Sequence, residues 1–531
     1  FKMKKLLSLV LVLALALSCV CVTVLAEGNE QPEVELNVWL GGPGKQADSD
    51  EVWAAFNEQL KEYLPNTTVK FTAITIDEYS EKWSKAMAAG ENVDVAWFGW
   101  ILDINKEISM GALTPLDDLI DQYAPDVKAE LGENALAAHT INDAVYAIPC
   151  WQGLANTLRK DLQLKGDIVA AMENQNYVEE LEAVVSTALQ TDDLTTRYQM
   201  FYDKFEEFLA SAKETNTLGL GYFYFDLPVH DKIGIGFDIG IYVNMGDDSF
   251  TLQSDYISDS DAFDLTLYQY SRLNDYWKKG YLREDYRTCD MDVNFGGGDP
   301  DVSWVADVYN AMPVYNKAYS GAEAADARAS ERAGFDVRLV SGGDICRLEK
   351  GYATCTVIPY TSKNPERAMM YINLMNSSKG AELYQTMVYG LEGKHYTYEG
   401  DRIVTTGGEG QADSTWPYGQ WDWAIGTKMN SLLRVGDAEG ILEKMQATEK
   451  NAIVLPLYNF NFDPTNVEVE IMNVTAISDE YRYLYTYDDY EARLRERNDK
   501  MMAAGYERIM AEVQAQLDAY LAANDVSWPE F

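Results

Sequence analysis

Short apolar stretches alternate with amphipathic stretches over the segment that follows residue 33. The apolar stretches have the length of strands, and those between them repeat apolar side chains every three or four positions, as helices do. In chain order, the predicted strands and helices are Val34–Leu40, Asp48–Tyr63, Val69–Ile74, Tyr79–Ala89 and Val93–Phe98. This order predicts an α/β unit whose mainly parallel sheet is covered by helices on both faces.

Two loops follow predicted strands of this unit, and sheets of this kind bind ligands beyond the carboxyl ends of their strands. The first loop is 41–45 (GGPGK), and the second is 98–100 (FGW). GGPGK lacks the spacing of a phosphate-binding loop, and Pro43 removes an amide that a phosphate would need. We therefore expect this loop to place backbone amides and Lys45 near a neutral polar ligand.

The segment 141–162 has the pattern of a strand that leaves one folded unit and enters another. A turn and a short extended run lead to Pro149, which favours an extended backbone at the residue before it. An aromatic and an amide residue, Trp151 and Gln152, follow after Cys150. Short apolar segments at 302–305 and 352–359 are interpreted as a second and a third crossing between the same two units.

The length of the chain also indicates more than one domain. A chain of 531 residues exceeds what one hydrophobic core usually supports. With three crossings, we expect two discontinuous lobes. The first contains residues 33–149 and 303–358, and the second contains residues 150–302 and 359–531, including a long charged helix at Asp488–Ala523.

The N-terminal segment has the pattern of an export signal. Two lysines precede an apolar run that ends at Ala26, so residues 1–26 are predicted to be a signal peptide that is removed before Glu27. Lipid attachment at Cys19 is an alternative, because the preceding residues are similar to a lipobox. An uncleaved membrane anchor is a third possibility. Each alternative predicts an extracytoplasmic protein.

Charge and cysteine content exclude several classes of function. The chain has 43 Lys and Arg against 85 Asp and Glu, a net charge of −42, which repels nucleic acids and anionic lipid surfaces. Beyond the predicted signal peptide, four cysteines are too few for a disulfide scaffold. Cys346 and Cys355 are either bridged or free. Because cysteines and histidines do not cluster with zinc spacing, we predict no metal and no cofactor.

Several motifs, in the order in which they occur along the chain, resemble family 1 extracellular solute-binding proteins of ABC importers, and more closely their LipO-type subgroup. The motifs are YAIP with RKDL (146–162), GALTPLDDL (111–119), SKNPERAMMYINLM (362–375), GLEGKHYTY (390–398), WPYGQWDWAIG (416–426) and LYNFNFDP (457–464). The resemblance covers nearly the whole chain after residue 26. Residues 164–196 and 310–334 depart from it, because they are longer and more acidic than expected.

The resemblance implies a two-lobed α/β fold of the type II periplasmic-binding-protein (venus-flytrap) class, with extra C-terminal helices. It implies a non-catalytic, monomeric receptor that captures an oligosaccharide or similar polar solute by hinge closure and delivers it to an ABC permease. A secreted glycoside hydrolase is an alternative, because a chain with 85 acidic residues can hold the required carboxylate pair. A peptide receptor of the same fold is a further alternative.

A receptor for a neutral carbohydrate needs aromatic rings for the apolar sugar face and polar groups for the hydroxyls. We expect Trp151 to face the ligand, so that Trp151→Ala lowers affinity. For any single tryptophan, however, core packing is an equal alternative and predicts a loss of stability instead. The candidate ligand-binding residues at strand ends, crossings and aromatic segments are Lys45, Trp100, Trp151, Gln152, Tyr224, Trp304, Asp307, Trp421 and Trp423.

Overall fold

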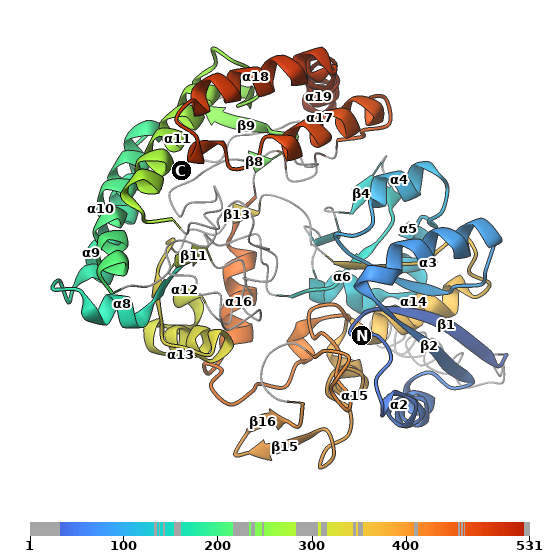
Figure 1. The fold of residues 1–531 in the computed structure, drawn as a ribbon. Helices are drawn as coiled ribbons and strands as arrows, with labels where there is room; N and C mark the ends of the chain where they lie inside the picture. The colour runs from blue at the N-terminus through green and yellow to red at the C-terminus, as the bar shows by residue number, and fades with distance from the viewer. Residues whose placement is uncertain are drawn as a thin grey trace, which may run out of the picture.

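The computed structural model describes most of the chain after residue 31 (Figure 1). The predicted signal peptide and the alternative at Cys19 lie outside the described residues. The described residues are 32–131, 135–136, 139–141, 144–152, 161–215, 233–234, 239–246, 249–282, 306–308, 316–343, 347–348, 354–407, 412–454, 457, 460 and 462–524.

A five-stranded sheet organises the first unit. Its strand order is β2-β1-β3-β14-β6, with β1 parallel to β2 and β3, and with β14 antiparallel to β3 and β6. The strands are β1 (Val34–Gly42), β2 (Thr67–Thr75), β3 (Val95–Phe98), β6 (Ile148–Pro149) and β14 (Cys355–Val357). The five elements predicted at the start of the chain are confirmed, with bounds shifted by a few residues.

Helices cover both faces of this sheet because successive side chains of β1 point to opposite faces. Val38 and Leu40 pack on the face that α2 and α14 cover, whereas Trp39 packs on the face that α3 covers. The helices of this unit are α2 (Ser49–Tyr63), α3 (Ile76–Ala89), α4 (Ile104–Ser109), α5 (Asp117–Tyr123), α6 (Pro125–Leu131), α14 (Pro365–Met375) and α15 (Ala381–Tyr389).

The second unit contains a smaller sheet, of order β11-β7-β12, in which both outer strands run antiparallel to β7. Its helices form an arc on the other side of the molecule (Figure 1). Aromatic side chains of α10, such as Phe201, Phe205 and Phe208, are fully buried in the core of this unit. The elements are β7 (Leu162–Lys165), α8 (Gly166–Ala171), α9 (Tyr177–Leu189), α10 (Leu194–Glu214), α11 (Asp261–Lys279), β11 (Ala306–Val308), α12 (Lys317–Ser320), α13 (Ala322–Ala333) and β12 (Val337–Val340).

C-terminal helices pack beside a third sheet, of order β10-β9-β8. The long helix that we predicted at Asp488–Ala523 is divided in two, because Gly505 has a left-handed backbone, with φ 100°, that ends the helical path. The elements are β8 (Ile233–Gly234), β9 (Ile241–Gly246), β10 (Ser249–Ser254), α17 (Glu468–Glu480), α18 (Tyr490–Ala503) and α19 (Tyr506–Ala523).

Shorter elements connect these units. Helix α16 packs against Trp151 and Tyr319, next to the first predicted crossing. The remaining elements are the strands β4 (Thr140–Ile141), β5 (Ala144–Val145), β13 (Arg347–Leu348), β15 (Tyr396–Glu399), β16 (Arg402–Thr405) and β17 (Ile453–Val454), the helix α16 (Ile441–Lys450), and the 3-10 helices η3 (Ser378–Gly380), η4 (Lys428–Asn430) and η5 (Leu484–Thr486).

The pairing of strands corrects the expected lobe boundaries. We expected 303–358 in the first lobe, but β11 and β12 pair with β7 in the second unit. We expected 359–531 in the second lobe, but α14 and α15 pack on the first sheet. Local sequence patterns predict a strand or a helix, whereas the partner of each element depends on contacts between residues far apart in the sequence.

Within the described residues, no helix combines the length and the apolar character that a membrane crossing requires.

Candidate functional site

The carboxyl ends of β1 and β3 lie side by side in the first sheet, since the two strands run parallel. The chain leaves β3 through Gly99 and reaches Trp100, whose side chain is 60% exposed. An exposed tryptophan at the carboxyl edge of a parallel sheet is placed where such sheets bind ligands. Trp100 thus lies directly after a strand of this sheet, as expected, and its contact with a ligand stays a prediction.

Four indoles form a continuous group at this edge, which we call the tryptophan row: Trp97, Trp100, Trp423 and Trp421. The ring centroids of Trp97 and Trp100 are 5.8 Å apart, and the rings meet edge to face at 86°. Trp100 and Trp423 are also 5.8 Å apart, at 33°. Trp423 and Trp421 are stacked at 4.9 Å and 17°. The structure thus brings together three of the predicted site residues from two distant segments.

The row presents an aromatic face at Trp100, whereas the indole N–H groups of its other three members face the protein. Trp421 Nε1 donates a hydrogen bond to the carbonyl of Ala412 at 2.9 Å. The Nε1 atoms of Trp97 and Trp423 are buried, and the described part of the chain offers neither of them an acceptor. An exposed aromatic face matches a polar ligand that has an apolar C–H face.

The segment that carries Trp421 and Trp423 is fixed to the loop that follows β1. Gln46 Nε2 donates to the carbonyl of Asp413 at 2.7 Å, and its Oε1 accepts from the amide of Gly419 at 3.0 Å. Buried Gln46 therefore ties the segment of Trp421 and Trp423 to the loop after β1 by both ends of its amide.

The start of α2 is held by a second set of contacts. The side chain of Asp48, at the N-cap of this helix, accepts no cap hydrogen bond there. Asp48 instead lies 3.0 Å from Lys394 Nζ and 3.2 Å from Nε2 of buried His395. Hydrogen bonds from Lys394 and from His395 lower the pKa of the Asp48 carboxyl.

Lys45 does not point its ammonium group at the tryptophan row. Lys45 Nζ lies 2.8 Å from Asp50 and 5.7 Å from the ring centroid of Trp53, which is a cation–π distance. Both charged groups are exposed, so the ion pair contributes little to stability. A ligand contact by Lys45 stays a prediction.

Trp151 occupies a different environment from the one we expected. Its side chain is only 3% exposed and packs in a cluster with Tyr319 and Met445, and its Nε1 donates a hydrogen bond to Glu449. The expectation that this indole presents a face to ligand is wrong in this structure. The reason is that α16, far away in the sequence, covers the crossing strand.

The remaining predicted site residues are placed only in part. Gln152 is half-buried directly after Trp151. Asp307 lies in the middle of β11, opposite Gln163 of β7. Tyr224 and Trp304 lie outside the described residues.

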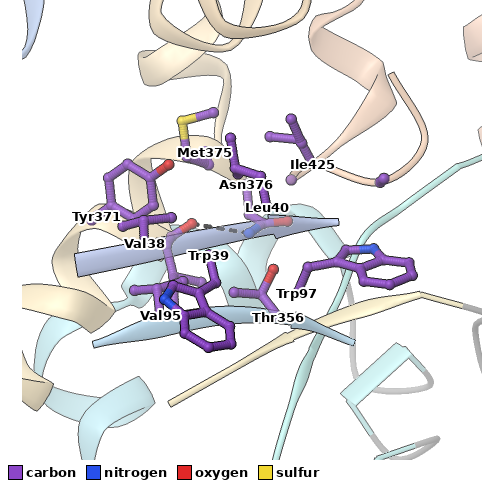
Figure 2. A pocket seen from close by; sticks show the side chains of 13 residues that line it. Val38, Trp39, Leu40, Val95, Trp97, Thr356, Tyr371, Met375, Asn376 and Ile425 are labelled. Carbon is purple, nitrogen blue, oxygen red and sulfur yellow. Dashed lines mark hydrogen bonds between the residues drawn. The ribbon is translucent and has the colours of Figure 1, made fainter. Parts of the chain in front are cut away.

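A small cavity lies between the first sheet and α14 (Figure 2). Its volume of about 30 Å³ is enough for a water molecule and far below the several hundred Å³ of a small-molecule site. Asn376 donates to the carbonyl of Ile372 at 2.9 Å, while its Oδ1 has no donor in the described part of the chain. The residues that line this cavity include Val38, Trp39, Leu40, Val95, Trp97, Thr356, Tyr371, Ile372, Met375 and Asn376. It is part of the core rather than the ligand site.

Sequence reasoning missed Trp97, which reads as an ordinary apolar strand residue. Its indole fills a space above Gly41 and Gly99, and a Cβ at either glycine would come within 2.2 or 2.3 Å of the ring. The signal that was available is a tryptophan in one of two neighbouring strands, of which one ends in glycine and the other is followed by glycine. Across the described ranges, no three metal-binding side chains are grouped as a metal site.

Comparisons with known proteins agree with this architecture. The family model for bacterial extracellular solute-binding proteins matches residues 46–382, and a domain of unknown function (DUF3502) matches residues 456–522. No curated protein matches the chain.

Solved structures of solute-binding proteins share the fold. The N-glycan transport solute-binding protein NgtS from Streptococcus pneumoniae aligns with a TM-score of 0.69 and 19% identity, covering 93% of this chain and 99% of that one. The same protein in complex with Man5GlcNAc gives a TM-score of 0.58 and 18% identity, covering 94% and 100%. A human-milk-oligosaccharide (HMO) binding protein from Bifidobacterium longum infantis gives 0.52 and 14%, covering 93% and 99%.

These likenesses confirm the expected two-lobed α/β fold, to which α17, α18 and α19 add the expected C-terminal helices. The matched region covers more than half of the chain and includes β2, β3, β6 and β14 of the first sheet, as well as β7 and α14. The chain therefore belongs to the family of bacterial extracellular solute-binding proteins, the extracytoplasmic substrate-binding components of ABC importers.

Proposed function

We propose that this solute-binding protein captures a neutral oligosaccharide, and that the tryptophan row forms part of its binding surface. The observation that carries the proposal is the exposed Trp100 at the carboxyl edge of the first sheet, backed by Trp423 and Trp421. Sugar rings stack their C–H faces on aromatic rings, and their hydroxyl oxygens accept hydrogen bonds from groups such as indole N–H. NgtS, which binds Man1GlcNAc and Man5GlcNAc, supports this class of ligand.

The wider function follows from the family and from the sequence. We propose export by the signal peptide at 1–26, with cleavage after Ala26 or lipid attachment at Cys19. Ligand contacts to both lobes stabilise a closed form, which delivers the sugar to a membrane permease. We assign the chain to the LipO-type subgroup, and we expect a monomer without catalytic activity.

A thermal-shift screen of the protein tests the ligand class. The panel contains Man1GlcNAc, Man5GlcNAc, maltotriose and cellotriose, with tripeptides as the competing class. An oligosaccharide at 100 times its Kd should raise the free energy of unfolding by about 2.7 kcal/mol. Stabilisation by peptides alone refutes the carbohydrate proposal. Release of new reducing ends during incubation identifies a hydrolase instead.

Substitution of Trp100 tests the site itself. Trp100→Ala removes the exposed ring, so it should weaken binding of the best oligosaccharide by about 1 to 3 kcal/mol, roughly 5- to 150-fold in Kd. Apo stability should change little, because the side chain is 60% exposed. Calorimetric titration measures Kd, and thermal melting measures stability.

Tyr398→Ala is the matched control for Trp100→Ala. Tyr398 is also an exposed aromatic side chain, at 45%, but it lies on the β15–β16 hairpin. Its variant should bind as the wild type does. Unchanged affinity of Trp100→Ala would remove the tryptophan row from the site.

A further inference from the structure

We infer that Trp97 is a positioning residue for ligand binding, which fixes the orientation of Trp100 without contacting the ligand. This inference rests on the proposed function, because it requires Trp100 to be a ligand contact. Trp97 is 3% exposed, whereas Trp100 is 60% exposed, so of the two rings only that of Trp100 is accessible from solvent. The edge-to-face contact at 5.8 Å and 86° joins them.

The Trp97 ring is held on more than one side. Its six-membered ring lies over the backbone at Gly41 and Gly99, where an added Cβ would come within 2.2 Å and 2.3 Å. Tyr79 of α3 meets the ring edge to face, at 5.3 Å and 81°. Figure 2 shows the indole beside the first sheet at one end of the small cavity. A ring confined in this way has little freedom to turn.

Trp100 lacks such confinement of its own. It follows Gly99, and its ring contacts are Trp97 on one side and Trp423 on the other. A large exposed side chain on a loop loses rotamer freedom when it stacks on a ligand. A rigid neighbour reduces that loss, because it favours the bound orientation before the ligand arrives.

Gly41 and Gly99 explain why position 97 can hold a tryptophan. Neither Gly41 nor Gly99 has a positive φ, so an alanine is compatible with the backbone at both positions. What excludes a side chain at either position is the Trp97 ring itself. The glycines therefore make room for this indole rather than for a turn.

A double-mutant cycle tests this role with the oligosaccharide that the wild type binds most tightly in the panel. Trp97→Phe keeps an aromatic core residue, but its smaller ring makes less contact with Trp100. It should weaken binding by about 2- to 12-fold, which corresponds to the strength of one aromatic pair. In the Trp100→Ala background the same substitution should change Kd less than about 2-fold, because its route to the ligand is gone.

Trp83→Phe is the matched control for lost core packing. Trp83 is fully buried on α3, contacts Phe98 at 4.9 Å and donates to Glu107 at 2.8 Å. This variant should lose stability but keep the wild-type Kd. Equal weakening by Trp83→Phe and Trp97→Phe would overturn the inference, as would an equal effect of Trp97→Phe with and without Trp100.

Gly99→Ala approaches the same question without altering Trp97. The added Cβ displaces the indole, so Kd should rise in the wild-type background, whereas the smaller ring of Trp97→Phe should tolerate it. An unchanged Kd for Gly99→Ala counts against the inference. If the wild type binds no oligosaccharide, the proposed function fails; if it binds and these variants bind equally well, only the role of Trp97 fails.

Discussion

Trp151 is a test of core packing at the scale of one residue. Its indole is 3% exposed among Tyr319, Leu442 and Met445, and its Nε1 is hydrogen-bonded to Glu449. Trp151→Ala leaves a cavity and removes the indole donor of Glu449, so we expect it to lower the free energy of unfolding by about 3 to 5 kcal/mol. Urea unfolding of the apo protein measures this change.

The same variant separates this role from the ligand contact that we expected from the sequence. Any variant protein that remains folded should bind oligosaccharide with an affinity close to that of the wild type. Trp151→Phe restores most of the packed volume and should recover part of the lost stability. If Trp151→Ala has the stability of the wild type but binds oligosaccharide weakly, Trp151 is a ligand contact rather than a core residue.

The sequence located tryptophans well where a strand end fixed their surroundings. Trp100 follows β3, and the carboxyl edge of a parallel sheet is predictable from the order of elements. Trp151 follows a crossing strand, but its environment depends on α16, which no local pattern connects to it. Trp97 was missed for the converse reason, since a buried strand residue gives no sign that its ring supports an exposed neighbour.

A buried carboxylate joins three elements of the second unit. Asp161, directly before β7, is 2% exposed. Its two oxygens accept hydrogen bonds from the amide of Lys317, at the start of α12, at 2.8 Å and from the amide of Gly342, after β12, at 3.1 Å. Burial raises the pKa of Asp161 to about 6, although these two hydrogen bonds oppose the shift.

This raised pKa predicts how the free energy of unfolding of the protein depends on pH. The pKa of Asp161 is about 6 in the folded state and about 3.9 in the unfolded state. Between these values only the folded state holds the proton, so the stabilisation is complete below pH 4 and is lost as pH rises through 6. The loss amounts to about 1 to 3 kcal/mol.

The Asp161→Asn variant has no titratable group at this position, so its free energy of unfolding should lack this pH-dependent contribution. Urea unfolding of both proteins at pH 4, 5, 6 and 7 gives the difference in their unfolding free energies. The wild type should lose stability relative to the variant over this range, because the other carboxylates titrate in both proteins. A difference that stays constant from pH 4 to pH 7 would show that Asp161 has an ordinary pKa.

Elements were easier to predict than their partners. The βαβαβ order at the start of the chain follows from local periodicity, and β1, α2, β2, α3 and β3 are all present. The pairing of β11 and β12 with β7 joins segments far apart in the sequence, so the expected bounds of the lobes failed there. The division at Gly505 required knowledge of one backbone angle.

At the scale of the whole molecule, the two units are joined by more than the crossing strands. Arg328 of α13 forms an ion pair with Asp437 at 2.7 Å, and both side chains are about nine-tenths buried. Asp437 also accepts from the amide of Arg434, next to the bridge with Ile403 of β16. We infer that the joint between the two units consists of this buried ion pair, the packing of α16 on Trp151 and the crossing strand β6.

Relative motion of the lobes about this joint predicts a change in overall size on binding. A compact chain of 531 residues has a radius of gyration of about 24 Å, and an open two-lobed protein exceeds that value. Small-angle scattering should show a larger radius for the apo protein and a decrease toward 24 Å at saturating oligosaccharide, because sugar contacts to both lobes favour the closed form. Trp100→Ala at the same oligosaccharide concentration, below its own Kd, should keep the apo radius. Equal radii for the apo and saturated wild type would show that the sugar binds without closure, whereas compaction of Trp100→Ala equal to that of the wild type would show that the tryptophan row does not hold the sugar.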